Sequence, residues 1–244
     1  MEIECLGLCE TGLVRKVNQD SIFLKLNDYA GIFVVADGMG GHSHGEIASQ
    51  MITKTMEEWW NHFSEEKFDW DFEKMIQSIR GSLSYANREI YQNYNQNMVC
   101  GSTLAILFFY KDRYAVLHAG DSRVYLEDQG FGCITVDDVW QNQPGLKAED
   151  KRDTSNPNYG HLTNALGIFD KLKICVQIGE LGEGMVFLLC SDGLYKMCDE
   201  KLIQESLVHI QEHDSMQQKA QELKNEVYNN GARDNLAIVL VKLK

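Results

Sequence analysis

The chain has 244 residues, of which 44% are hydrophobic and 24% charged, so it is long enough to bury a large core and has an ordinary globular composition. Its formal net charge of −13 argues against binding to nucleic-acid backbones or anionic membranes, which both depend on clusters of lysine and arginine. Because there are 2 prolines and no low-complexity linker, we expect a single domain over residues 1–244.

Neither export nor membrane insertion is expected from the sequence. The N-terminal residues carry no basic and apolar signal regions, and the apolar run Leu104–Tyr110 is too short to span a bilayer. The 7 cysteines are scattered and form no CxxC pair, which is typical of reduced thiols. We therefore expect a cytoplasmic protein.

The first part of the chain is organised around a glycine-rich motif. A strand over residues 2–10 and a turn over Thr11–Ser21 should precede a strand at Ile22–Leu26. The run Ile32–Ala36 is short, apolar and rich in β-branched residues, which predicts a buried strand. It ends at Asp37, and the glycines that follow would let the backbone approach a ligand. Taken alone, this pattern is equally compatible with a turn in which Asp37 caps a helix.

The rest of the chain should contain two pairs of helices separated by strands. Helices are predicted over residues 48–63 and 72–94, where apolar side chains recur at three- and four-residue steps. From Gly101 to Asp138 the pattern predicts an antiparallel meander of hairpins, and residues 139–161 should form a surface flap. The remaining elements are predicted as strands at 173–178 and 184–190, helices at 202–210 and 216–227, and a last strand after Asp234.

This order of elements indicates the fold class. Because the helices arrive in pairs and do not alternate with strands, a doubly wound parallel sheet is disfavoured. We predict an α+β fold, in which two antiparallel sheets flanked by helix pairs form a four-layer α-β-β-α sandwich. This arrangement would bury every apolar face of the predicted elements.

Five aspartates lie at the ends of predicted strands. One such residue is usually a turn residue or a cap, but five carboxylates at one sheet rim would repel one another unless cations neutralised them. Oxygen ligands without a His/Cys cluster select hard cations such as Mn²⁺ or Mg²⁺ over Zn²⁺. Arg15 could bind a phosphate beside them, although a solvated surface arginine is the default interpretation. The five acids are Asp20, Asp37, Asp121, Asp192 and Asp234.

Seven short motifs together resemble the bacterial metal-dependent protein Ser/Thr phosphatases, the protein phosphatase 2C-like family. Each motif is weak alone, but seven in the family's order over residues 11–240 are specific. The motifs are Arg15-x-x-Asn18-Gln19-Asp20, Ala36-Asp37-Gly38-Met39-Gly40-Gly41-His42, Gly101-Ser102-Thr103, Ala119-Gly120-Asp121-Ser122-Arg123, Leu162-Thr163-Asn164-Ala165-Leu166-Gly167, Cys190-Ser191-Asp192-Gly193-Leu194 and Arg233-Asp234-Asn235.

The resemblance implies an activity, its cofactors and a role for each matching residue. It implies that a hydroxide bridging two Mn²⁺ or Mg²⁺ ions hydrolyses phosphoserine and phosphothreonine in proteins, without a phosphoenzyme. The implied partners are phosphorylated proteins, among them a cognate Ser/Thr kinase and its substrates, and we expect a monomer. The implied roles are a bridge between both ions for Asp37, the first ion for Asp192 and Asp234, the second ion for Asp20 and the carbonyl of Gly38, a third and weaker ion for Asp121, and phosphate binding for Arg15.

The sequence also departs from the family pattern, chiefly near the flap. Met39 stands where eukaryotic relatives carry a histidine proposed as general acid, so metal-bound water would protonate the leaving alkoxide here. His42 and His44 lie nearby and either could substitute, but solvated loop histidines are the favoured interpretation. The usual Asp-His-Ser is replaced by Asp137-Asp138-Val139, the usual His-Pro by Asn156-Pro157, and an arginine before Ala-Leu-Gly by Asn164. These changes leave the acids intact and leave the substrate preference open.

Three other functions are alternatives to a protein phosphatase. An inactive relative that serves as a regulatory binding module should have lost at least one of the four principal acids, yet Asp20, Asp37, Asp192 and Asp234 are all present. The acidic charge disfavours a two-metal phosphodiesterase or nuclease. A phosphatase of a small phosphorylated metabolite stays open because the flap differs.

Overall fold

The structure is a computed structural model that describes residues 2–40, 44–65, 71–94, 99–212 and 215–244. Its helices are α1 (Gly45–Glu65), α2 (Phe72–Tyr94), α3 (Asp192–Tyr195), α4 (Glu200–Glu212) and α5 (Met216–Asn229). Its strands are β1 (Ile3–Glu10), β2 (Asp20–Leu26), β3 (Ala30–Met39), β4 (Gly101–Ser102), β5 (Leu104–Tyr110), β6 (Arg113–Ala119), β7 (Arg123–Glu127), β8 (Phe131–Cys133), β9 (Cys175–Glu180), β10 (Val186–Cys190) and β11 (Leu236–Leu243).

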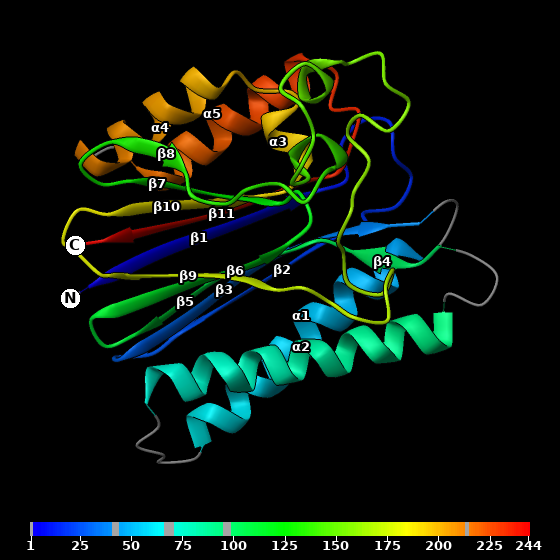
Figure 1. Cartoon of the computed structure of the whole chain (residues 1–244). Helices are drawn as coiled ribbons and strands as arrows, with labels where there is room; N and C mark the ends of the chain where they lie inside the picture. Colours follow the sequence, from blue (N-terminus) through cyan, green and yellow to red (C-terminus); the bar gives the residue numbers. More distant parts are fainter. Residues whose placement is uncertain (1, 41–43, 66–70, 95–98, 213–214) are drawn as a thin grey trace.

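Two antiparallel sheets lie face to face, and a pair of long helices covers the outer face of each (Figure 1). One sheet has the strand order β1-β11-β10-β7-β8 and packs against α4 and α5. The other has the order β2-β3-β5-β6-β9, with β4 paired to β3, and packs against α1 and α2. The predicted α-β-β-α sandwich is therefore confirmed.

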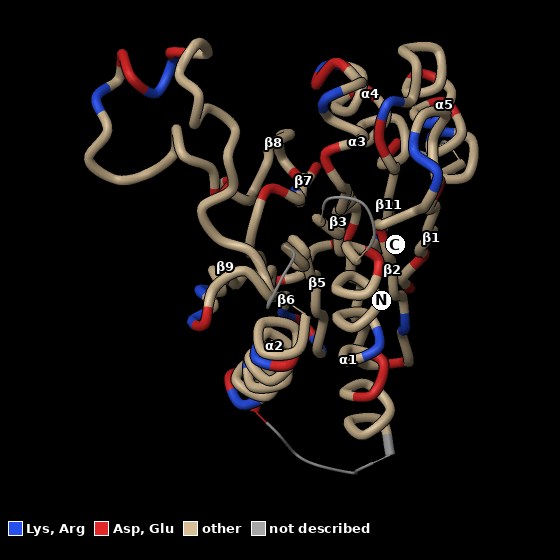
Figure 2. The backbone as a smooth tube through the Cα atoms, turned by 90° about the vertical axis from the view of Figure 1, so that its right-hand side faces the viewer, with Lys and Arg blue, Asp and Glu red and all other residues tan. Residues whose placement is uncertain are grey.

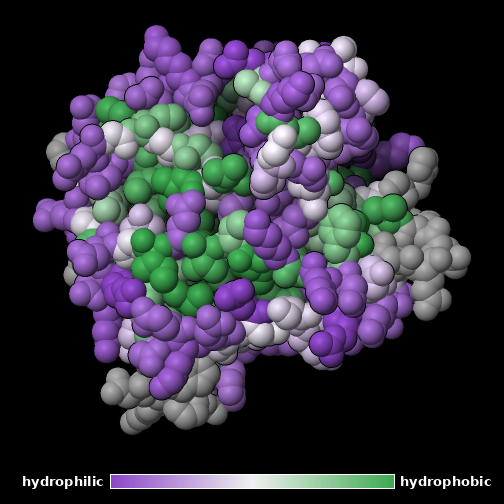
Figure 3. All heavy atoms as spheres, viewed as in Figure 1, coloured by the Kyte–Doolittle hydropathy of each residue, from purple (hydrophilic) through white to green (hydrophobic). Residues whose placement is uncertain are grey.

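Strand β3 shows why the run before Asp37 is apolar at every position. Ile32 and Val34 pack beneath α1 and α2, whereas Phe33 and Val35 pack between the two sheets. Successive side chains of a strand point to opposite faces, so a strand covered on both faces needs an apolar residue at each position. On the face shown in Figure 3, apolar residues gather in a band between the two helix layers.

The prediction of a single meander between Gly101 and Asp138 is wrong. Strands β5 and β6 form a hairpin in one sheet, whereas β7 and β8 form a hairpin in the other. The chain crosses between the sheets at Gly120, whose φ of +101° favours glycine and whose added Cβ would lie 2.7 Å from Thr103. The alternating pattern predicts the hairpins correctly, but it does not specify which sheet each hairpin joins.

Residues 139–161 form an irregular loop with two short 3-10 helices, η1 (Trp140–Asn142) and η2 (Asp150–Arg152). Val139 forms an isolated bridge with Leu162, so the two ends of the loop meet. Figure 2 shows the segment between β8 and β9 projecting from the sheets with charged residues of both signs.

Cysteine pairing and helix length are two further features of the fold. All 7 cysteines lie in the described part of the chain, and none forms a disulfide there. Cys190 is fully buried at the end of β10, where it packs as a small apolar residue. In the described part of the chain, no helix is long and apolar enough to cross a membrane.

Candidate active site

The strand register brings the five aspartates to the same end of the two sheets. Asp20 lies directly opposite Asp37 in the β2–β3 pair. Asp192 follows β10 and Asp234 precedes β11, and these two strands are antiparallel neighbours. Asp121 follows β6 at the crossing between the sheets. Residues that are far apart in the sequence thus share one rim of the sandwich.

The electrostatic effects among these acids show that their carboxylates act on one another. Burial raises the pKa of Asp37 well above its usual range, and the charges of the other four aspartates raise it further. Burial and the charge of Asp192 raise the pKa of Asp121 to about 6. Burial also raises the pKa of Asp20, with a smaller opposing effect from a hydrogen bond donated by Ser191. Without a cation, the cluster therefore carries an unfavourable concentration of negative charge.

Hydrogen bonds fasten the two sheets together directly at this rim. The hydroxyl of Ser191 donates to Oδ2 of Asp20 at 2.7 Å and accepts from the backbone N–H of Ala237 at 2.9 Å. The side-chain oxygen of Asn235 accepts from the backbone N–H of Gln19 at 2.9 Å. Ser191 and Asn235 belong to motifs that sequence reading singled out, but their part in joining the sheets is visible only in the structure.

The backbone around Gly38 is packed too closely for any side chain. An added Cβ on Gly38 would lie 2.2 Å from the carbonyl oxygen of Gly45 and 2.6 Å from that of Gln19. Two hydrogen bonds to Thr103 hold the backbone of the preceding residue, Asp37. The N–H of Asp37 donates to Oγ1 of Thr103, and the carbonyl of Asp37 accepts from the N–H of Thr103. Glycine at position 38 thus permits close approach of backbone beside the carboxylates.

Arg15 lies at the exposed edge of the cluster. Its Nη2 is 2.8 Å from Oδ2 of Asp234, and the two side chains are 52% and 37% exposed. The hydrogen bond from Arg15 and the charge of Asp234 raise the pKa of the guanidinium. Arg15 is therefore next to the acids, as the sequence suggests, and is accessible to a ligand from solvent.

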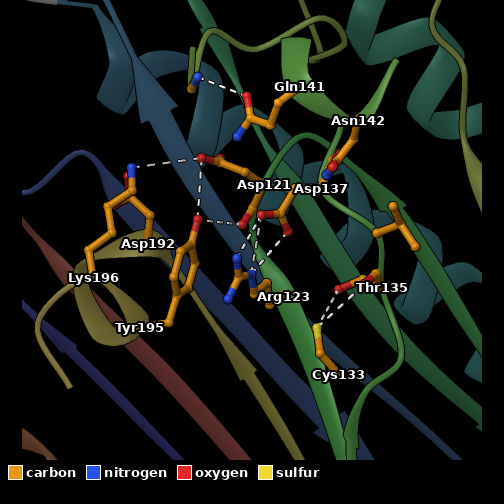
Figure 4. A network of polar contacts seen from close by, with 12 residues as sticks. Asp121, Arg123, Cys133, Thr135, Asp137, Gln141, Asn142, Asp192, Tyr195 and Lys196 are labelled. Atoms are coloured by element: carbon orange, nitrogen blue, oxygen red, sulfur yellow. Dashed lines mark hydrogen bonds and ion pairs between the residues drawn. The ribbon is translucent and has the colours of Figure 1, made fainter. Parts of the chain in front are cut away.

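Lys196 is a cation of the site that sequence reading missed. Its Nζ forms an ion pair with Asp192 and lies 3.9 Å from Oδ2 of Asp121 (Figure 4). The short helix α3 was not predicted, because its four residues are too few to show periodicity. The spacing of Asp192 and Lys196, one helical turn apart, is the signal that could have found the pair.

A second missed feature connects Asp121 to the base of the flap. The hydroxyl of Tyr195 donates to the backbone carbonyl of Asp121 at 3.0 Å, and the guanidinium carbon of Arg123 lies 3.7 Å from the centre of the Tyr195 ring. Arg123 also forms a two-point contact with Asp137, through Nε at 3.0 Å and Nη2 at 2.8 Å (Figure 4). Asp137 directly precedes the segment that leads into the flap.

Of Met39 and the two histidines near it in the sequence, the structure describes Met39 and His44. Met39 is half-buried at the end of β3, and the carbonyl of His44 accepts a hydrogen bond from Sγ of Cys100. His42 lies outside the described residues. The interpretation of His42 and His44 as solvated loop histidines, with metal-bound water as the general acid, stays a prediction.

Comparison with known proteins identifies the family. A sequence model described as protein phosphatase 2C matches residues 14–240. The chain belongs to the protein phosphatase 2C family. The family predicted from the seven motifs is thereby confirmed. The match also spans nearly all of the residues over which those motifs are distributed.

Relatives within the protein phosphatase 2C family match almost the full length. The chain is 28% identical over 242 residues to the serine/threonine phosphatase stp of Listeria welshimeri, covering 96% of this chain and 93% of that protein. The solved structure of the S. agalactiae serine/threonine phosphatase is 26% identical, with a TM-score of 0.84 and coverage of 100% of both chains. A solved catalytic domain of the phosphatase PstP in complex with 2 manganese ions is 26% identical, with a TM-score of 0.78 and coverage of 99% of each chain.

Proposed function

We propose that this protein is a metal-dependent phosphatase that hydrolyses phosphoserine and phosphothreonine in proteins. The observation that carries the proposal is the cluster of five carboxylates at one rim of the sheets, where burial and then the charges of the other four acids raise the pKa of Asp37. Buried carboxylates that repel one another at one rim destabilise a fold, but divalent cations bound between them would offset this repulsion. Membership of the protein phosphatase 2C family supplies the reaction class.

The donor atoms suit two Mn²⁺ or Mg²⁺ ions. The clustered acids offer oxygen atoms, which hard divalent cations prefer, and the crowded glycine at position 38 lets a backbone carbonyl serve as a further oxygen donor. When bound, such ions lower the pKa of a water molecule and neutralise charge on a phosphoryl group. The two manganese ions in the related PstP domain support this assignment. We propose Asp37 as a ligand of both ions, Asp192 and Asp234 as ligands of the first, and Asp20 and Gly38 as ligands of the second.

The chain's own cations would complete the site. We propose that the guanidinium of Arg15 binds the phosphoryl oxygens, because it lies at the exposed edge of the acids and presents paired donors. The ammonium of Lys196 partly neutralises Asp121 and Asp192. A third ion at Asp121 would therefore compete with Lys196, and we expect it to bind weakly.

The domain organisation, partners and location of the protein are the remaining parts of the proposal. We propose one catalytic domain over residues 1–244, with residues 139–161 as a flap beside the site, acting as a monomer on phosphorylated Ser/Thr proteins that include a cognate kinase and its substrates. The scattered cysteines, which form no CxxC pair in the sequence, support a cytoplasmic location. The name of the Listeria relative, a serine/threonine phosphatase, supports protein substrates over a small metabolite.

The test is hydrolysis by the purified chain with defined metals. With Mn²⁺, the protein should release phosphate from p-nitrophenyl phosphate and from phosphoserine and phosphothreonine peptides, and EDTA should abolish both activities. Readdition of Mn²⁺ should restore them. Full activity in EDTA would overturn the metal-dependent mechanism, and activity confined to a panel of phosphorylated metabolites would overturn the assignment of protein substrates.

A further inference from the structure

A second set of potential metal ligands lies at the base of the flap and contains none of the clustered aspartates. His118, Asp138 and Cys175 each offer one ligand atom, and these atoms all lie within 4.8 Å of one another. The three residues line a cavity of about 640 Å³ that also borders residues leading into and out of the flap, such as Val139 and Thr163. The donors are a ring nitrogen, a carboxylate oxygen and a thiol sulfur.

The β-sheet itself fixes two of these ligands opposite each other. His118 on β6 and Cys175 on β9 are directly paired in the antiparallel register. Directly opposite residues project from the same face of a sheet with closely spaced side chains. The alternate residues Leu117 and Val176 pack toward α1 and α2, so His118 and Cys175 project from the face that meets the other sheet.

The hydrogen bonds of His118 and Asp138 leave suitable donor atoms for a metal. Nε2 of His118 lies 2.9 Å from the carbonyl oxygen of Val136, and a ring that donates its proton there carries a lone pair on Nδ1. Oδ2 of Asp138 accepts from the backbone N–H of Gly120 at 3.1 Å and from Nδ2 of Asn164 at 2.7 Å. Outer hydrogen bonds of this kind orient metal-ligating histidines and carboxylates.

Two of the departures from the family pattern meet at this place. Asp138 stands where the family usually has a histidine, and Asn164 where it usually has an arginine, and the two side chains are in direct contact. Asn164 also donates to the backbone carbonyl of Lys173, two residues before Cys175. The substitutions thus replace two potential cations by a carboxylate and the amide that orients it, which makes the cavity suitable for a positive ion.

We propose that His118, Asp138 and Cys175 form a site for a Zn²⁺ ion at the base of the flap. Nitrogen, sulfur and oxygen donors from three side chains suit Zn²⁺, and the cavity leaves a fourth position for water. The all-oxygen cluster of aspartates favours Mn²⁺ or Mg²⁺ instead. The two sites would therefore differ in metal selectivity because their donor atoms differ. Binding would replace the thiol proton of Cys175 by the ion and release that proton to solvent.

The test measures Zn²⁺ binding to the full chain in Mn²⁺ buffer with a phosphine reductant. Zn²⁺ is titrated in competition with a chromophoric chelator, and alkylation of individual cysteines is followed by mass spectrometry. The wild type should bind one Zn²⁺ that protects Cys175 from alkylation. Cys175→Ser and Asp138→Asn should each weaken this binding by more than about tenfold, since each removes a direct ligand.

Two control variants make the result specific. Cys5 is another half-buried free thiol on a different sheet, so Cys5→Ser should bind Zn²⁺ like the wild type. Asp37→Asn alters the carboxylate cluster and should leave Zn²⁺ protection of Cys175 intact, which separates this site from the proposed catalytic one. Wild-type Zn²⁺ affinity in Cys175→Ser, or an alkylation rate of Cys175 that Zn²⁺ does not change, would overturn the proposal.

Discussion

Arg15 and Asp234 form an ion pair of 2.8 Å, so the residue proposed to bind phosphate contacts a residue proposed to bind metal. Both side chains are more than one-third exposed, and such pairs contribute at most about 1 kcal/mol to stability. A cation at Asp234 would compete with the guanidinium for the same carboxylate. The pair is therefore weak enough to open, which would make Arg15 available to a phosphoryl group.

Replacing Arg15 should mainly weaken substrate binding. Arg15→Ala removes a planar cation with paired donors, so KM for a phosphopeptide should rise at least several-fold while kcat changes less. Arg15→Lys keeps the charge but loses the paired geometry, so its KM should lie between that of the wild type and that of Arg15→Ala. Steady-state kinetics with Mn²⁺ measures both constants. The exposed neighbour Lys16 is the matched control, and equal KM values for Arg15→Ala and Lys16→Ala would remove Arg15 from the phosphate site.

Replacing Asp37 should have opposite effects on activity and on stability. Asp37→Asn removes a proposed ligand of both ions, so kcat should fall by orders of magnitude. The metal-free variant should nevertheless be more stable, because burial and the charges of four other acids both disfavour a negative charge at position 37. Its Tm should rise by about 2–4 °C for each kcal/mol of this unfavourable free energy that the substitution removes.

Thermal unfolding in EDTA and in Mn²⁺ checks this prediction. The wild type should gain Tm with Mn²⁺, because an ion that binds only the folded state stabilises it, whereas Asp37→Asn should gain much less. Asp28 lies exposed in the turn at the other end of the β2–β3 hairpin, so Asp28→Asn should behave like the wild type in both buffers. An Asp37→Asn protein with normal activity would contradict the assigned role.

The sequence predicts the fold and the acids well because both depend on local patterns. Helical spacing marks α1 and α2, and an apolar run followed by Asp37 marks a buried strand that reaches a sheet rim. The contacts that cross the molecule are different. Neither the Ser191–Asp20 hydrogen bond nor the assignment of β7 to the second sheet has a local signature, because both depend on how the two sheets face each other.

Features that depend on very short elements are also not predicted from the sequence. Helix α3 has four residues, so no apolar period identifies it, and the pairing of Lys196 with Asp192 depends on that helix. The contact between Asp138 and Asn164 likewise has no local signature, although each residue departs from the family pattern. The structural effect of a departure from the family pattern can be assigned only when the residue that it contacts is known.

Removing the charge of Lys196 should alter cation binding. Lys196→Met keeps most of the length of the side chain but leaves Asp192 and Asp121 without its ammonium group. The metal-free variant should have a lower Tm, and Mn²⁺ should bind more tightly, by roughly fivefold for each kcal/mol that Lys196 now supplies. Isothermal titration of the EDTA-stripped protein measures affinity and stoichiometry.

The control for Lys196 is a lysine that is distant from the acids. Lys54 lies exposed on α1, where it pairs with Glu58, so Lys54→Met should leave Mn²⁺ binding unchanged. A stoichiometry that increases in Lys196→Met alone would show that the ammonium occupies the place of a further ion. Identical titrations for the two variants would mean that Lys196 does not neutralise the site.

Two glycine-to-alanine variants should have opposite effects. In Gly38→Ala the new Cβ would lie 2.2 Å from the carbonyl oxygen of Gly45, so the backbone beside Asp37 must shift, and both Mn²⁺ affinity and activity should fall. Gly81 lies in α2 with nothing within 4 Å of an added Cβ. Gly81→Ala should therefore stabilise the protein by about 0.5–1 kcal/mol through helix propensity, with unchanged activity. Thermal unfolding and phosphatase assays on both variants check the contrast, and an active Gly38→Ala protein with wild-type Mn²⁺ affinity would show that close backbone approach at position 38 is not required.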